Sequence, residues 1–170
     1  MPPRDPRTSP IATGEEVVIR RVFNAPRERV FKAWTDPEHF RRWWGPRDFT
    51  TPFVNIDPRP GGTIHFCMRS PEGRELWGGG VYREIDEPAR IVVSDYFADE
   101  EGNVVPATHY GFSSEWPLET MITITFEENA GKTTMTLRHS MGGVPAADRE
   151  GADQGWKESF DRLADYLRSA

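Results

Sequence analysis

The sequence predicts an α+β domain in which a curved antiparallel sheet of about seven strands packs against one long C-terminal helix. Two observations predict this class. Strand-like segments follow one another, separated by turns, with no helices alternating between them. The end of the chain is instead helical in pattern, because large apolar residues recur at helical spacing between Trp156 and Leu167. Such a helix needs an apolar sheet face to cover, so we expect the sheet to curve around it.

One strand and two short helices are expected before the main run of strands. Residues 15–24 are rich in β-branched and aromatic side chains and lead into a turn. Pro26 suits the first position of a helix. The second helix begins with Asp36 as N-cap and Pro37 as first helical residue, and Gly45-Pro46 ends it.

Six further strands follow, separated by segments rich in turn-forming residues. They are expected over residues 51–57, 63–69, 76–85, 90–97, 118–127 and 133–141. Gly78, Gly79 and Gly80 lie inside one of them, where glycines indicate a bend, a bulge or the close approach of another backbone. Residues 98–114 have no clear period and are expected to form a long loop, and such loops often cover a site.

Composition limits the partners and the compartment. One domain is expected over residues 15–170, after a flexible tail, 1–14, that lacks the apolar stretch of a signal peptide. The net charge of -6, without a basic run, argues against nucleic acid as a partner. No segment has the roughly 20 apolar residues that membrane insertion needs. Cys67 is the only cysteine and forms no internal disulfide, so a cytoplasmic location is expected.

His139 is the histidine best placed for a binding site. Alternation with Met135, Leu137 and Met141 puts it on the apolar face of its strand. It is either the polar anchor of a pocket or a buried histidine bonded to backbone or to a neighbouring carboxylate, and both interpretations stay open. No two histidines have the spacing of metal ligands, so neither a metal nor another cofactor is expected.

No catalytic residue is assigned from the sequence. The serines lack the Gly-x-Ser-x-Gly context of a hydrolase nucleophile, and Cys67 has no evident base partner. Asp95 and Glu119 remain candidates for an acid or base at the mouth of a cavity.

Six Trp and ten Phe residues must line a core or a pocket. Gly151 and Gly155 leave a bare helix edge beside Trp156, where we expect another group to approach closely. Of Trp43 and Trp44, one is expected to point inward and the other toward a cavity entrance. The candidate ligand-binding residues are Trp43, Trp44, Phe66, Met68, Tyr82, Tyr96, His139, Met141, Trp156 and Phe160.

Several short motifs share an order and spacing with a known family. They are Ala25-Pro26 with Val30 and Trp34, Thr35-Asp36-Pro37, Trp43-Trp44-Gly45-Pro46, Asp57 with Arg59-Pro60-Gly61-Gly62, residues 99–106, and Gly155-Trp156. With these motifs the chain resembles the START-like (SRPBCC) helix-grip superfamily. Within it, the chain is similar to the branch that includes the C-terminal domain of the heat-shock-chaperone ATPase activator. The resemblance covers nearly the whole chain after Gly14.

The resemblance implies a seven-stranded sheet gripping the C-terminal helix, with a cavity between them that takes lipids, polyketides, hormones or other hydrophobic molecules. It does not specify one ligand, because fold alone does not determine function. We therefore expect binding of a small hydrophobic molecule of lipid, polyketide or aromatic type. Two alternatives remain: a cyclase-, aromatase- or hydrolase-like enzyme using the same cavity, and a chaperone cofactor acting through its outer surface. Besides the small molecule, the candidate partners are a chaperone and a second copy of the chain.

Overall fold

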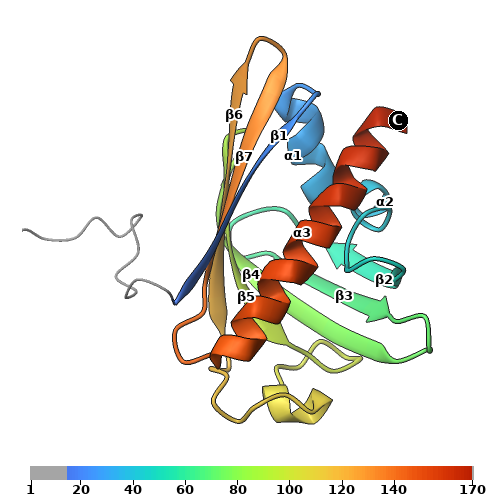
Figure 1. Cartoon of the computed structure of the whole chain (residues 1–170), viewed down its shortest axis with the longest axis vertical. Helices are drawn as coiled ribbons and strands as arrows, with labels where there is room; N and C mark the ends of the chain where they lie inside the picture. The colour runs from blue at the N-terminus through green and yellow to red at the C-terminus, as the bar shows by residue number, and fades with distance from the viewer. Residues whose placement is uncertain (1–14, 170) are drawn as a thin grey trace, which may run out of the picture.

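In the computed structural model, which describes residues 15–169, one antiparallel sheet curves around a long C-terminal helix (Figure 1). The seven strands lie in the order β1-β7-β6-β5-β4-β3-β2. They are β1 (Glu16–Phe23), β2 (Thr50–Ile56), β3 (Thr63–Arg69), β4 (Glu75–Asp86), β5 (Arg90–Phe97), β6 (Thr120–Asn129) and β7 (Lys132–Ser140). The α-helices are α1 (Arg27–Thr35), α2 (Pro37–Phe40) and α3 (Ala146–Ser169). The expected tail, 1–14, lies outside the described residues.

This arrangement confirms the predicted fold class, with two short helices after the first strand and the long helix last. The expected N-cap is also present, since the Asp36 side chain accepts a hydrogen bond from the Glu38 backbone N–H at 2.9 Å. β6 begins two residues later than expected, because its ladder with β5 starts where Thr120 pairs with Asp95. No helix within residues 15–169 is long and apolar enough to cross a membrane.

The glycines of β4 permit the close backbone approach that the sequence indicates. A Cβ atom at Gly80 would lie only 2.0 Å from the carbonyl oxygen of Ser94 on β5. The register between β4 and β5 shifts nearby, between Tyr82 and Glu84. Because bulges increase the local twist of a strand, this shift helps the sheet to bend over α3.

The two halves of α3 have different surroundings. In the C-terminal half, Phe160, Leu163 and Leu167 are buried in the main core. Trp43, in the turn after α2, packs into the same core, and its indole N–H donates to the Ala33 carbonyl oxygen at 3.0 Å. The N-terminal half of α3 instead passes over the ends of the central strands and beside the loop between β5 and β6 (Figure 1). A cavity lies against this half of the helix.

The segment between β5 and β6 is more ordered than the irregular loop expected from the sequence. It contains a short 3-10 helix, η2 (Ala107–Tyr110), and one isolated antiparallel bridge. Near its start, the Asp99 carboxyl accepts hydrogen bonds from the backbone N–H groups of Asn103 and Glu101, and these lower its pKa. The acidic stretch is therefore a turn, held by hydrogen bonds from its own backbone N–H groups to the Asp99 carboxyl.

Cys67 lies on β3 and only 1% of its surface is exposed. Burial, followed by the nearby Glu75 carboxylate, raises the pKa of its thiol to about 11. Since the thiolate is the reactive form, we expect iodoacetamide at pH 8 to modify the native protein at least about tenfold more slowly than the urea-unfolded chain. Mass spectrometry of the alkylated protein over time checks this. Equal rates would show that Cys67 is accessible in the native state.

Candidate ligand-binding site

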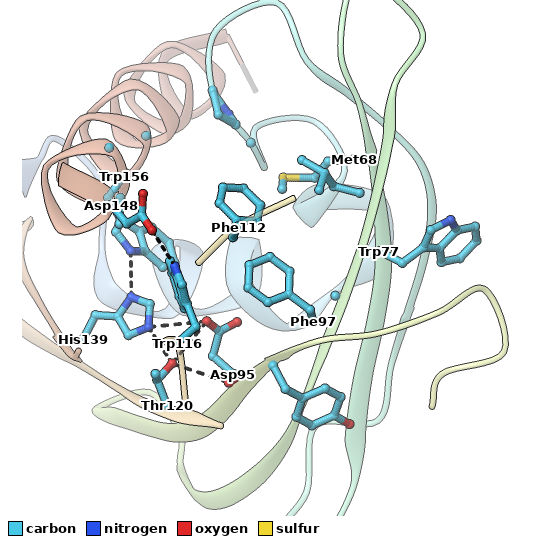
Figure 2. Close-up of a pocket in the computed structure, with 18 of the residues that line it drawn as sticks. Met68, Trp77, Asp95, Phe97, Phe112, Trp116, Thr120, His139, Asp148 and Trp156 are labelled. Carbon is cyan, nitrogen blue, oxygen red and sulfur yellow. Dashed lines mark hydrogen bonds and ion pairs between the residues drawn. The ribbon is translucent and has the colours of Figure 1, made fainter. Parts of the chain in front are cut away.

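A partly enclosed cavity of about 400 Å³ lies between the N-terminal half of α3 and the sheet (Figure 2). Its walls come from β3, β4, β5, the first residue of β6, the end of β7, the turn after α2, α3 itself, and the loop between β5 and β6. Most of the lining side chains are apolar. In the wall formed by the loop, the ring of Phe97 stacks on Phe112 at 5.2 Å and meets Trp116 edge-on at 5.3 Å. A volume of this size matches sites for small organic molecules.

The cavity gathers six of the ten residues that the sequence singles out for ligand contact. These are Trp44, Phe66, Met68, Tyr96, His139 and Trp156. Trp43, Met141 and Phe160 are fully buried in the core and do not line the cavity. Tyr82 lies beside a separate void of only about 30 Å³, and burial raises its pKa. Ligand contact itself remains a prediction for all ten.

The bare edge of α3 faces open space, contrary to the close approach expected there. A Cβ atom at Gly151 would meet nothing within 4 Å, and one at Gly155 would meet only Pro46, at 3.8 Å. Both glycines line the cavity. Their missing side chains therefore add to the space under the helix and do not admit a neighbouring element.

One end of the cavity is polar and centres on His139, which is 4% exposed. The indole N–H of Trp156 donates to His139 Nδ1 at 3.2 Å, so Nδ1 acts as an acceptor and the ring proton belongs on Nε2. Nε2 lies 2.8 Å from the Thr120 hydroxyl and 3.3 Å from Asp95 Oδ2. Figure 2 shows the four side chains joined in this network. His139 is a buried histidine that is hydrogen-bonded to Thr120 and Trp156, lies 3.3 Å from the Asp95 carboxylate and also lines the cavity.

The proton position limits what His139 can do. With Nδ1 accepting from Trp156, Nε2 carries the hydrogen and is not free to remove a proton from Thr120. A Thr–His nucleophile pair would need the opposite tautomer and would break the bond to Trp156. The network therefore orients the Asp95 carboxylate. Glu119, the other acid considered from the sequence, pairs with Arg83 at 3.2 Å and is absent from the cavity wall.

A hydrogen bond joins the loop to α3 across the cavity. The Trp116 indole N–H donates to Asp148 Oδ2 at 2.8 Å, as Figure 2 shows. Sequence reasoning missed both residues, and it missed Phe97 and Phe112 as well. The sequence did predict that this loop covers a site. Because the loop has no regular spacing of hydrophobic residues, the sequence does not reveal which of its side chains point inward.

Within residues 15–169 there is no group of three or more His, Cys, Asp or Glu side chains placed to hold a metal ion.

A sheet curved around a long C-terminal helix, with a cavity between them, defines a helix-grip protein. More specifically, the chain belongs to the family described as "Activator of Hsp90 ATPase homolog 1-like protein", whose model matches residues 24–168. No curated protein is significantly similar to it in sequence.

Solved structures share the fold over most of the chain. A protein from Arthrobacter aurescens is 25% identical, with a TM-score of 0.78, over 92% of this chain and 87% of that one. A protein from Staphylococcus epidermidis is 26% identical, with a TM-score of 0.74, over 94% and 93%. A protein from Mycobacterium smegmatis is 26% identical, with a TM-score of 0.72, over 91% and 89%.

Proposed function

We propose that this protein binds a small hydrophobic molecule in the cavity between α3 and the sheet. The observation that carries the proposal is the cavity itself, whose volume is about 400 Å³ and whose walls are largely aromatic and aliphatic. A concave, largely apolar space of this size is typical of sites that bind small organic molecules.

The glycines of α3 support the same proposal. Each glycine inside a helix costs about 1 kcal/mol relative to alanine, and a Cβ at either Gly151 or Gly155 would meet no serious obstruction. Helix stability alone would therefore favour alanine or a larger residue over glycine at both positions. Glycine at both positions keeps the cavity volume under the helix free of side chains.

The test is native mass spectrometry of the purified full chain, followed by thermal unfolding with a panel of aromatic alcohols, fatty acids and aromatic amines. A copurified molecule, or a rise in Tm that grows with ligand concentration, is the expected result, because a ligand that binds only the native state stabilises it by mass action. Val22→Ala, at an exposed position on the edge strand β1, should show the same response. No copurified molecule and no change in Tm across the panel would contradict the proposal.

Trp116→Phe is expected to speed ligand release. The substitution keeps an aromatic ring in the loop but removes the N–H that bonds to Asp148. Because a hydrogen bond to a carboxylate contributes about 1.5 kcal/mol or more, we expect a several-fold higher dissociation rate in stopped-flow displacement. Tyr166→Phe is the matched control, since it removes the hydrogen bond to His39 but keeps an aromatic ring, and Tyr166 does not line the cavity. Identical rates for wild type and Trp116→Phe would show that this bond does not hold the loop closed.

The second candidate function is an enzyme that uses Asp95 as a general base on a molecule held in the same cavity. The observation that favours it is the placement of a carboxylate, oriented by His139 and Thr120, beside an apolar space. A copurified molecule that changes mass on incubation with wild type, but not with Asp95→Asn, would support catalysis. Binding without turnover would leave the protein as a binding module.

A further inference from the structure

We propose that the cavity selects a ligand with a positive charge, namely a hydrophobic amine or ammonium compound. This inference rests on the proposed function and adds the charge of the ligand to it. The first observation is the balance of charge in the cavity wall. Asp95 and Asp148 line it, while no Lys or Arg of the described chain does so.

Neither carboxylate contacts a Lys or Arg side chain of residues 15–169. Asp148 Oδ2 accepts from the indole N–H of Trp116, and Asp95 Oδ2 accepts from the Thr120 hydroxyl and lies 3.3 Å from His139 Nε2. The indole N–H of Trp156 occupies Nδ1 of His139, so Nε2 carries the ring hydrogen beside Thr120 and Asp95. The other oxygen of each carboxylate, Oδ1, accepts no hydrogen bond from residues 15–169.

The nearest cationic side chains have partners elsewhere. Arg83 pairs with Glu119. Arg162 donates to the carbonyl oxygens of Trp44, Gly45 and Pro46 at 3.0–3.1 Å, and burial lowers its pKa. Arg149 donates to the Val144 carbonyl oxygen. The helix dipole at the start of α3 also favours a negative charge at Asp148, so Asp95 on β5 is the stronger part of the argument.

The remaining residues of the cavity wall are suited to the apolar part of a hydrophobic amine. Aromatic residues from four parts of the fold line the cavity with the two carboxylates, namely Trp44 after α2, Phe97 on β5, Phe112 in the loop and Trp156 on α3. Ring faces attract cations, most strongly where water is excluded, and they also take up the apolar part of the molecule. An anionic ligand would have to place its charge in the same apolar space as two carboxylates, with no Lys or Arg of residues 15–169 in the wall to receive it.

Three probes that share one naphthalene ring test the charge directly by titration calorimetry at pH 7 and low salt. They are 2-(1-naphthyl)ethylammonium, 2-(1-naphthyl)ethanol and 1-naphthylacetate. We expect the ammonium compound to bind about tenfold or more tightly than the alcohol, as a charge-assisted hydrogen bond would give, and the acetate to bind most weakly. Added salt should lower the affinity for the ammonium compound and leave the affinity for the alcohol nearly unchanged.

Asparagine variants locate the effect. Asp95→Asn should remove most of the advantage of the ammonium compound and keep the affinity for the alcohol within about twofold, because asparagine preserves shape and hydrogen-bonding oxygen. Asp148→Asn should have the same effect to a smaller extent. Asp165→Asn is the matched control on the exposed side of α3, where Asp165 contacts Arg168, and it should change none of the three affinities.

The outcomes separate this inference from the proposed function. If the alcohol or the acetate binds as tightly as the ammonium compound, the selection for charge is wrong and hydrophobic binding stands. An ammonium advantage that persists in both Asp95→Asn and Asp148→Asn would overturn the assignment to these carboxylates. If none of the three probes binds, the result counts against both proposals.

Discussion

Alanine at Gly80 is expected to destabilise the domain by about 3 kcal/mol or more. The added Cβ would lie 2.0 Å from the Ser94 carbonyl oxygen and 3.0 Å from a methyl group of Val93. The first of these atoms belongs to the backbone of β5, which is paired to β4 on one side and β6 on the other. Relief of the clash therefore requires the two central strands to separate.

Urea denaturation followed by circular dichroism measures this effect. Gly151→Ala is the matched control, because its Cβ would meet nothing within 4 Å, and it should raise the free energy of unfolding by up to about 1 kcal/mol. A Gly80→Ala protein as stable as wild type would mean that β4 and β5 are not packed as described.

Filling the cavity from the helix side is expected to abolish binding without loss of stability. Gly155→Leu places a branched side chain in the space between Pro46 and Trp156, and leucine is a far better helix former than glycine. We expect at least a tenfold loss of affinity for 2-(1-naphthyl)ethanol, together with a free energy of unfolding equal to or above that of wild type. Titration calorimetry and urea denaturation provide the two readouts.

Gly155→Ala is the control for this experiment. It supplies the same gain in helix propensity with little loss of volume, so it should bind the alcohol nearly as wild type does. Undiminished binding by Gly155→Leu would place the ligand elsewhere on the protein.

The fold could be predicted because its signals are local. The period of two along β6 and β7, the period of 3.6 along α3 and the cap at Asp36 each depend on a few neighbouring residues. The same periods place Phe66, Met68 and His139 on the concave face, where they line the cavity.

The site could be predicted only in part, because periodicity separates inside from outside but does not separate core from cavity. Trp43 and Trp44 are adjacent aromatics after α2, yet one is fully buried and the other lines the cavity. The contact between Trp116 and Asp148 joins a loop to a helix 32 residues away. The role of a glycine also depends on its tertiary surroundings. Gly80 allows the backbone of β5 to approach closely, whereas Gly155 leaves space under α3.

The most direct test of the binding cavity is a ¹H–¹⁵N NMR titration of the full chain with 2-(1-naphthyl)ethanol, with the tryptophan indole signals as reporters. The account predicts large shifts for Trp116 and Trp156, whose indoles line the cavity. It predicts little change for Trp43 or Trp34, whose indole N–H groups are bonded within the core and which do not line the cavity. Shifts confined to Trp34 and Trp43, or none at saturating ligand, would contradict it.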